Sequence, residues 1–345
     1  MRLLFVTGSL VHGGAERHSI TLLNRLAERG HDCHAAYVKN DPSQLERLHP
    51  GPGGSVACLH AQRFLDRRAV ARLAAQLTVL RPSAVVAAND YAAMYALLAR
   101  WLAGVAVPLV ATFHSTRMRT LREQAKMLIA RALFPRLDCL VFVSANQRRY
   151  WGRRGLWTRR IEVIHNGVDT QAFRPAAFAG EAAEVRRRFG MAPADFVVGM
   201  LAVMRPEKNH VQLLDAVAAL RRLGVPARAL LIGDGPLRPA IEARARALGV
   251  DAFVAITGFQ DEVRPHVAAC DAVALCSDTE AFSLAAIEAM AMGKPVVHSD
   301  VGGAREMITD GHDGYVFPVG DDDALVHCLV RLADPARARP MGAGA

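Results

Sequence analysis

Two glutamates that lie eight residues apart, Glu280 and Glu288, are the first candidates for chemistry in this sequence. The small and apolar residues between them predict a helix that begins at about Ser283 and ends at Gly293. Glu280 then lies in the loop before the helix, and Glu288 lies two turns into it. The amino end of a helix presents unpaired N–H groups and partial positive charge, which suit a phosphate. A carboxylate beside such a phosphate is better suited to accept hydrogen bonds from neighbouring hydroxyl groups.

Apolar strands are expected on both sides of this loop and helix, at residues 272–276 and 295–298. A strand, a loop, a helix and a second strand in this order place the loop at the carboxyl edge of a parallel sheet. Open α/β sheets bind their ligands at this edge. The simpler interpretation, an acidic residue before a helix and a solvated glutamate within it, stays open at this point.

Two further candidates come from the first half of the chain. Gly13 and Gly14 follow an expected first strand and open a helix, but they match neither the dinucleotide fingerprint nor the P-loop. Paired glycines let the backbone approach a ligand, although a plain tight turn is the alternative. His114 ends an expected strand at 108–113 and therefore lies at a sheet edge. The chain has thirteen histidines, so a structural role for His114 is equally open.

Charged residues follow the first expected strand of the second half. Arg205 and Lys208 lie between that strand and the next helix, where they could hold a diphosphate, although a solvated charged turn is the alternative. Three consecutive aspartates at 321–323 favour the amino end of a helix over a metal site. No metal and no cofactor is therefore expected.

Strands and helices alternate along the whole chain, which predicts an α/β fold with parallel, doubly wound sheets. We expect a Rossmann-like, acceptor-binding domain over 1–170, a linker over 171–195 and a Rossmann-like, donor-binding domain over 196–333. The tail at 334–345 has no apolar face, and it is expected to be disordered or truncated.

Length and composition agree with two domains. The chain has 345 residues, of which 52% are hydrophobic, enough for two cores. No run of 18 apolar residues occurs, so no transmembrane helix is expected. The amino terminus resembles a first strand rather than a signal peptide. Six scattered cysteines without a Cys-x-x-Cys pair indicate a reduced, cytoplasmic protein.

Positive charge is concentrated in the first half of the chain. Residues 117–160 hold twelve Lys and Arg against two Asp and Glu, with apolar residues at helical spacing between them. Such a stretch can lie on an anionic membrane surface, which would make the protein peripheral at the inner membrane face. Core packing with solvated arginines is the alternative. Nucleic acid ranks last, because few aromatic residues interleave with the basic ones.

Taken together, the motifs resemble those of glycosyltransferase family 4, over nearly the whole chain. Each of the shorter motifs is unspecific alone, whereas the two glutamates, the following Gly-Lys-Pro-Val-Val and the later Gly-Gly-x-x-Glu are specific as a set. All the motifs that carry the resemblance are, in chain order, Gly13-Gly14, His114, the turn 166–169, Pro206-Glu207-Lys208, the turn 233–236, Glu280 to Glu288, 293–297 and Gly302-Gly303-x-x-Glu306.

The resemblance implies the GT-B fold, two Rossmann-like domains that face each other across a cleft. It also implies a retaining glycosyltransferase that moves a sugar from a nucleotide-diphosphate sugar to a glycan or lipid-linked acceptor, in the synthesis of cell-envelope polysaccharide or glycolipid. A nucleotide-sugar epimerase and an inactive GT-B binding scaffold are the alternatives.

The resemblance further implies a role for each matching residue. Glu280 would bind hydroxyls of the donor sugar, and Glu288 those of the ribose. The other implied roles are diphosphate binding by Lys208 and Arg205, backbone N–H contacts from Phe282, Ser283 and Leu284, a hydrogen bond from His114 to the donor sugar, and close backbone approach at Gly14. His114 and Glu280 are the two catalytic candidates.

The chain departs from the family pattern at two of these motifs. Val203 stands where an arginine is usual, five residues before the lysine, and Ala281 stands where a glycine is common.

Overall fold

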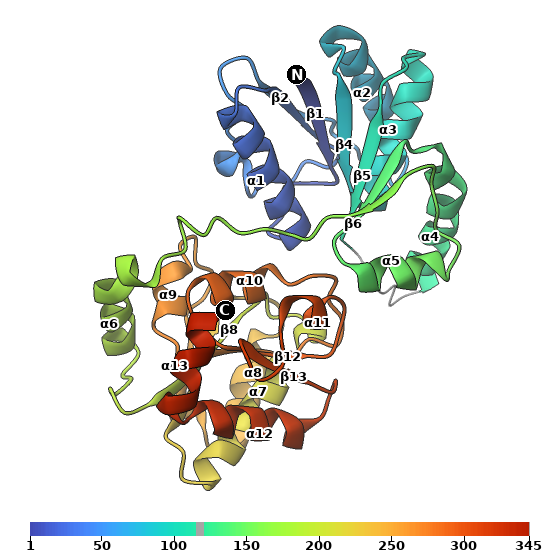
Figure 1. Cartoon of the computed structure of the whole chain (residues 1–345). Coiled ribbons are helices and arrows are strands. Elements are labelled where there is room, and N and C mark those ends of the chain that lie inside the picture. Colours follow the sequence, from blue (N-terminus) through green and yellow to red (C-terminus); the bar gives the residue numbers. More distant parts are fainter. Residues whose placement is uncertain (115–120, 345) are drawn as a thin grey trace. The chain divides into compact units, whose positions relative to one another are not determined.

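The chain forms two compact units, Met1–Asn166 and Gly167–Ala345. The computed structural model describes residues 1–114 and 121–344, and within them the side chains other than those of 121–126, 339, 343 and 344. Each unit is built around its own sheet, as the sequence predicted (Figure 1).

The first unit contains a seven-stranded parallel sheet with the strand order β3-β2-β1-β4-β5-β6-β7. The strands are β1 (Arg2–Thr7), β2 (Asp32–Tyr37), β3 (Ser55–Cys58), β4 (Ala84–Ala88), β5 (Leu109–Phe113), β6 (Cys139–Phe142) and β7 (Ile161–Val163). The helices are α1 (Gly14–Glu28), η1 (Leu45–Arg47), α2 (Arg67–Leu80), α3 (Asn89–Ala103), α4 (Leu121–Leu133), η2 (Phe134–Arg136) and α5 (Ala145–Gly152). The strand order reverses direction between β1 and β4, which is where open α/β sheets form their ligand crevice.

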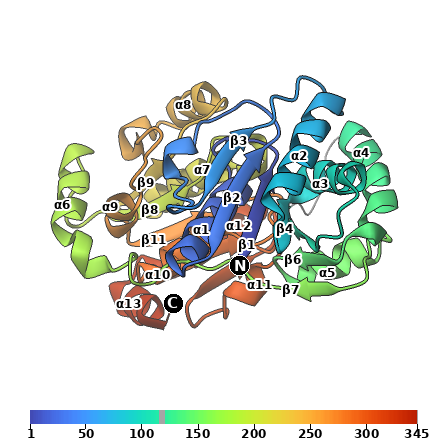
Figure 2. The same ribbon diagram turned by 90° about the horizontal axis from the view of Figure 1, so that it is seen from above.

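Alternating side chains of β1 separate the apolar core of this unit into two layers. Leu4 and Val6 pack with α2 and α3, whereas Leu3 and Phe5 pack with α1. A strand sends successive side chains to opposite faces, so an uninterrupted apolar strand must be covered on both sides. Figures 1 and 2 show α1 on one face of the sheet and α2 with α3 on the other.

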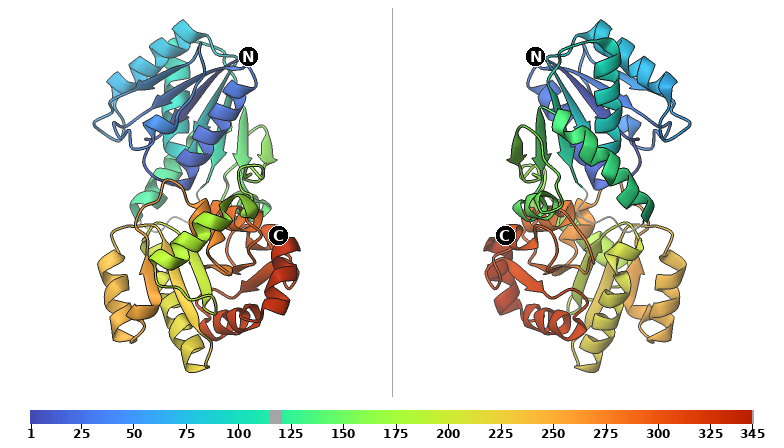
Figure 3. Two further views of the ribbon diagram at one scale, coloured as in Figure 1. Left: turned by 90° about the vertical axis from the view of Figure 1, so that its left-hand side faces the viewer. Right: turned by 90° about the vertical axis from the view of Figure 1, so that its right-hand side faces the viewer.

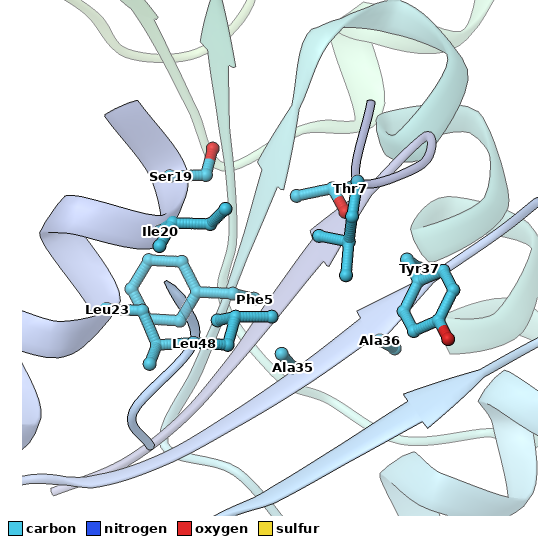
Figure 4. A pocket seen from close by; sticks show the side chains of 10 residues that line it. Phe5, Thr7, Ser19, Ile20, Leu23, Ala35, Ala36, Tyr37 and Leu48 are labelled. Carbon is cyan, nitrogen blue, oxygen red and sulfur yellow. The ribbon is translucent and has the colours of Figure 1, made fainter. Parts of the chain in front are cut away.

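A small apolar pocket lies between α1 and the strands β1 and β2 (Figure 4). Ile20 and Leu23 of α1 line it from one side and Phe5 from the other, and Leu48 closes it. The hydroxyl of Ser19 on its wall donates to the carbonyl of Ala15, 3.0 Å away. This gap is a feature of core packing beneath α1, and the candidate site described below does not include it.

The second unit contains a six-stranded parallel sheet with the strand order β10-β9-β8-β11-β12-β13. The strands are β8 (Phe196–Leu201), β9 (Ala227–Ile232), β10 (Val254–Ile256), β11 (Ala272–Leu275), β12 (Val296–Ser299) and β13 (Gly314–Phe317). The helices are η3 (Pro175–Phe178), α6 (Ala179–Arg188), η4 (Pro206–Lys208), α7 (His210–Arg222), α8 (Arg238–Ala247), η5 (Asp251–Phe253), α9 (Arg264–Ala268), α10 (Leu284–Ala291), α11 (Ala304–Met307), α12 (Asp322–Leu332) and α13 (Pro335–Gly344).

The same alternation organises the second unit. Val198 and Met200 of β8 face the core beneath α7 and α12, whereas Val197, which precedes Val198, faces the core beneath α9 and α10. Both faces are therefore covered, which explains why the strands are almost wholly apolar.

Two boundaries differ from those expected. The segment 171–195 was expected to be a linker, but it contains η3 and α6, and it belongs to the second unit. The reason is that Ala182 and Val185 of α6 are buried in the same core as α9 and α10. The sequence of this alanine-rich segment predicts the burial of α6 only weakly, because small apolar residues scarcely raise the hydrophobicity of a helix.

The tail at 334–345 was expected to be disordered, but α13 occupies Pro335–Gly344. This helix packs on α12, and both are red in Figure 3. Met341 is 7% exposed and joins the core beneath α12. One large apolar residue among glycines, alanines and arginines fixes this helix, and a single residue produces no amphipathic pattern.

No described helix is both long and apolar enough to cross a membrane.

Candidate functional site

The loop after β11 carries Glu280 at the carboxyl edge of the second sheet, as predicted. It ends at Ser283, whose hydroxyl caps α10 by accepting a hydrogen bond from the N–H of Ala286 at 3.2 Å. This cap fixes where the helix begins, because a serine oxygen satisfies one of the unpaired N–H groups of the first turn. The loop and the amino end of α10 therefore have a defined geometry.

Glu280 forms an ion pair with Lys208, through Oε2 and Nζ. Lys208 ends η4, in the loop after the neighbouring strand β8, and the two side chains are 26% and 21% exposed. A backbone hydrogen bond of 2.9 Å from the N–H of Asp278 to the carbonyl of Glu207 joins the same two loops. The sequence predicted both residues for one site but gave them separate ligands, whereas here they bind each other.

Two glycines after β12 contact the backbone of the Glu280 loop. The N–H of Gly303 donates to the carbonyl of Ala281 at 2.9 Å. Gly302 has a φ of +56°, and a Cβ atom on it would lie 2.1 Å from the carbonyl oxygen of Glu280. The hydroxyl of Ser299 also donates to the carbonyl of Ser277, 2.6 Å away. The sequence showed the two glycines as part of a motif, but it did not show that their backbone contacts determine the position of the Glu280 loop.

Arg205 begins the turn that carries Lys208, and its carbonyl accepts the N–H of Lys208 at 3.1 Å. Its side chain is exposed and forms no ion pair or side-chain hydrogen bond with the described residues. Its charge is thus available to a ligand, and its role in diphosphate binding stays a prediction.

Glu288 lies in α10, two turns beyond the loop, and it is 4% exposed. Phe282 is buried as well, and Leu284 is partly exposed at the first turn of the helix. A carboxylate as buried as Glu288 is rare in proteins unless polar groups compensate it. The structure thus places the predicted residues on one loop and helix, and the ribose contact of Glu288 stays a prediction.

His298 is a residue of this region that the sequence did not single out. It is fully buried near the end of β12, and its Nδ1 lies 2.7 Å from the carbonyl oxygen of Ser299. A carbonyl only accepts, so Nδ1 carries the proton, and Nε2 has no partner among the described residues. Burial lowers the pKa of His298, and the charges of Glu280 and Lys208 act on it in opposite directions. In the sequence, the only signal that His298 lies near the candidate site is its position in the strand that follows the Glu280 loop and α10.

The aspartates at 321–323 lie at the amino end of a helix, as the sequence favoured. Asp321 accepts the N–H of Ala324 at 2.9 Å at the start of α12, and Asp322 accepts the side-chain amide of Gln212 at 2.8 Å. In residues 1–114 and 121–344, no group of three or more His, Cys, Asp or Glu side chains is placed to hold a metal ion.

In the first unit, His114 follows β5 at the carboxyl edge, as predicted. Its N–H donates to Oδ1 of Asn89 at 2.9 Å, and its ring centroid lies 5.1 Å from that of His18 on α1. Burial, and to a smaller extent the charge of His18, lowers the pKa of His114 to about 3. The ring is therefore neutral at physiological pH. Gly14 is the first residue of α1, at the same edge of the sheet.

Acidification is expected to destabilise the protein through His114. The unfolded imidazole takes up a proton near pH 6.5, whereas the buried ring stays neutral down to about pH 3. The unfolded state therefore binds more protons in this window, and stability falls as the pH falls. At pH 5 the loss is about 2 kcal/mol. Denaturant titrations at pH 7.5 and 5 should show His114→Gln losing about 2 kcal/mol less than the wild type.

The exposed His312 provides the control for this measurement, because its ring is 69% exposed. His312→Gln should follow the wild type at both pH values. Equal losses in His114→Gln and the wild type would contradict the assignment.

Comparison with family models separates the chain into the same two parts. Residues 12–172 match the model described as Glycosyltransferase Family 4, and residues 195–334 match the model described as Glycosyl transferases group 1. The chain belongs to glycosyltransferase family 4. The family and the enzyme class that the sequence indicated are thus confirmed.

Curated relatives of this family 4 glycosyltransferase differ widely in their named substrates. The N-acetyl-alpha-D-glucosaminyl L-malate synthase of Bacillus anthracis is 25% identical over 93% of this chain and 84% of its own length. A GDP-mannose-dependent alpha-(1-6)-phosphatidylinositol monomannoside mannosyltransferase of Mycolicibacterium smegmatis is 35% identical over 59% of this chain. The matched part spans 56% of that mannosyltransferase's length.

Solved structures confirm the GT-B fold of this family 4 glycosyltransferase. The Anabaena protein HepE in complex with UDP-glucose superposes with a TM-score of 0.87, covering 100% of this chain and 93% of HepE at 24% identity. Sucrose-phosphate synthase from Thermosynechococcus elongatus superposes with a TM-score of 0.81, covering 99% and 92% at 21% identity.

Proposed function

We propose that the protein transfers a sugar from a nucleoside-diphosphate sugar to an acceptor, with retention at the anomeric carbon. The observation that supports this most is the ion pair between Lys208 and Glu280, at the carboxyl edge of the second sheet and beside the capped start of α10. A cation for phosphate and an anion for hydroxyl groups lie together there, and a nucleotide-sugar offers both kinds of group.

The positive charges act on the leaving group. When the bond from the sugar to the diphosphate breaks, negative charge develops on the departing phosphate. Lys208 supplies a partly buried ammonium group for it, and Arg205 supplies an exposed guanidinium on the same turn. The N–H groups of Phe282, Ser283 and Leu284 add fixed dipoles at the helix start. Groups that are already in place need no reorganisation in the transition state.

The carboxylates act on the hydroxyl groups of the donor. Glu280 accepts hydrogen bonds from the transferred sugar, and Glu288 accepts them from the ribose. His114 is neutral at physiological pH, so it acts as a hydrogen-bonding group toward the sugar rather than as a cation. Gly14 lets the backbone approach the reacting centre.

We further propose that the leaving phosphate itself helps to deprotonate the acceptor, so that the new bond forms on the face from which the nucleotide departs. In this mechanism the protein needs no nucleophile and no metal ion. The charge that a metal would otherwise supply comes from Lys208, Arg205 and the helix start.

The acceptor is a glycan or a lipid-linked sugar in this proposal, and the pathway is the synthesis of cell-envelope polysaccharide or glycolipid. The names of the two relatives support a polar or lipid-bearing acceptor, because one forms an L-malate glycoside and the other extends a phosphatidylinositol mannoside.

A screen of nucleotide-sugars by thermal shift, followed by a turnover assay, tests the proposal. At least one nucleoside-diphosphate sugar should raise Tm, because a ligand at a hundred times its Kd stabilises the folded state by about 2.7 kcal/mol. Turnover should be the same with and without EDTA, and the product should keep the anomeric configuration. No shift with any nucleotide-sugar would contradict the proposed activity, and release of free nucleotide without transfer would favour the epimerase.

Association with an anionic membrane is a second part of the proposal. Part of the basic stretch at 117–160 lies outside the described residues, so its expected helical face is only partly tested. The part whose side chains are described, 127–160, exposes arginines of α5 and its following turn. Trp157 lies among them and is 59% exposed. An exposed tryptophan with surrounding cations suits a lipid interface.

Removing two of these charges is expected to weaken binding to vesicles of anionic lipid. Each basic residue near such a surface contributes about 1 kcal/mol, so Arg153→Gln with Arg154→Gln should lower the partition constant roughly 30-fold. Co-sedimentation at low salt measures this. Arg222→Gln with Arg246→Gln removes the same charge from the second unit and should change little. Equal losses in both double variants, or no binding by the wild type, would contradict the proposed surface.

A further inference from the structure

A cluster of aromatic rings with a lysine lies at the carboxyl edge of the first sheet, and the roles above leave it unused. Tyr91 lies in the first turn of α3, just after β4, and Lys39 follows β2. The N–H of Lys39 donates to the carbonyl of Gly8 at 3.0 Å, directly after β1. These residues therefore surround the point between β1 and β4 at which the strand order reverses, where ligands of such sheets bind.

The rings and the cation contact one another. The Nζ atom of Lys39 lies 5.4 Å from the centroid of the Tyr91 ring, and the ring of Phe64 lies 5.4 Å from that of Tyr91. A Cβ atom on Gly8 would lie 3.4 Å from the Tyr91 ring, so the glycine loop after β1 borders the same surface. Phe64 and Tyr91 are partly exposed, and Lys39 is exposed.

Tyr95 fixes the positions of Phe64 and Tyr91 through hydrogen bonds and ring packing. Its hydroxyl accepts the N–H of Asp66 at 2.9 Å and donates to the carbonyl of Phe64 at 3.2 Å, and its ring packs 5.2 Å from that of Tyr91. The Oη atom of Tyr91 is buried, so the side chain offers ring carbon rather than its hydroxyl to a ligand. Fixed apolar rings suit the C–H face of a sugar ring.

The charge of Lys39 is not neutralised by the nearby carboxylates. Asp66 accepts N–H groups at the start of α2, and Asp41 accepts from Ser43. Lys39 forms no ion pair with any described residue, and its contact with Tyr91 leaves the ammonium group open to an anion. Lysine binds phosphate as a point charge.

We propose that Lys39, Phe64 and Tyr91 form an acceptor subsite for a phosphorylated sugar, with the sugar ring against Tyr91 and Phe64 and the phosphate against Lys39. This inference rests on the proposed transfer reaction and adds the chemical class of its acceptor. The phosphate is either free, as in a soluble sugar phosphate, or esterified to a lipid.

Calorimetry on the full chain with paired probes tests the subsite. The pairs are glucose 1-phosphate with glucose and inositol 1-phosphate with inositol, and inorganic phosphate is titrated alone. A sugar phosphate should bind at least about fivefold more tightly than its neutral partner and than inorganic phosphate, as one ion pair of about 1 kcal/mol requires. Lys39→Gln should abolish the preference, Lys39→Arg should restore it, and Tyr91→Leu should weaken both members of a pair.

Two controls locate the effect. Arg29→Gln removes a charge from the exposed end of α1, at the opposite edge of the sheet, and should keep the preference. Lys208→Ala should keep it as well, which separates this subsite from the donor phosphates. Equal binding of phosphorylated and neutral probes, or an unchanged preference in Lys39→Gln, would overturn the inference.

The nucleotide-sugar thermal shift, measured on the same variants, distinguishes the two levels of the proposal. The subsite alone would be overturned if a nucleotide-sugar raises the Tm of both the wild type and Lys39→Gln, but the wild type shows no preference for phosphorylated over neutral sugars. The absence of any donor shift would overturn the transfer reaction. A prenyl-phosphate-linked glucose in detergent micelles identifies the source: tighter binding than glucose 1-phosphate indicates a lipid-linked acceptor, and equal binding indicates a soluble one.

Discussion

Replacing Glu280 by glutamine is expected to lower kcat/KM for the nucleotide-sugar by about 100-fold, which corresponds to about 2.7 kcal/mol. Glutamine keeps the size of the side chain but removes its charge, so the donor hydroxyls lose a charged acceptor. A hydrogen bond to a charged group contributes about 1.5–3 kcal/mol. Lys208 also loses its partner, which alters the cation that is proposed to bind the diphosphate. Steady-state kinetics at saturating acceptor measure the change.

Glu242→Gln is the matched control for this variant. Glu242 pairs with Arg238 on α8 at 2.9 Å, and the same change there removes a carboxylate of similar chemistry from the unit's surface. The control should retain wild-type kinetics and Tm. Full turnover by Glu280→Gln, with an intact fold, would remove Glu280 from the site.

Replacing Gly302 by alanine is expected to destabilise the second unit by about 2–4 kcal/mol and to weaken donor binding with it. The new Cβ atom would lie 2.1 Å from the carbonyl oxygen of Glu280, too close for any real contact. Overpacking costs about 1–3 kcal/mol, and the positive φ of +56° adds a backbone cost of about 1 kcal/mol. The Glu280 loop must move to relieve the contact, and this displaces the ion pair with Lys208.

Gly311→Ala separates the two costs. Gly311 has a φ of +81°, but no atom lies within 4 Å of a Cβ atom placed on it, so only the backbone cost applies. Urea unfolding and titration with a nucleotide-sugar should show a larger loss of stability in Gly302→Ala, and a loss of affinity in that variant only. Equal losses in both variants would show that the contact with Glu280 is unimportant.

The positions of Lys208, Glu280 and His114 at the sheet edges were predictable, because each of these residues follows a strand. Alternation of apolar strands and helices places Lys208 and Glu280 after strands of one sheet, and parallel connections bring such ends to one edge. The neighbouring order of β8 and β11 was not contained in the sequence pattern. It follows from packing between segments far apart in the chain, and it decides that the two charged groups meet.

Buried and small residues were harder to interpret. His298 sits within an apolar strand, where a histidine resembles any other interruption, and its proximity to Glu280 depends on strand order. The support from Gly302 depends on a close backbone approach that spacing does not encode. The helix α13 escaped prediction because one buried methionine fixes it, and α6 because its core residues are small.

The ion pair between Lys208 and Glu280 also has a consequence for ligand selection. Because Glu280 pairs with Lys208, it is a tethered anion that would compete with a free anion for the same ammonium group. At the proposed site, inorganic phosphate or a nucleoside diphosphate would displace the Glu280 carboxylate from Lys208 and leave that carboxylate without a partner. In the proposed donor complex, a nucleotide-sugar compensates both groups at once, because its phosphate meets the lysine and its sugar hydroxyls meet the carboxylate. The ratio of the affinities for the nucleotide-sugar and for the free nucleoside diphosphate, compared between the wild type and Glu280→Gln, measures how strongly this tethered anion discriminates between them.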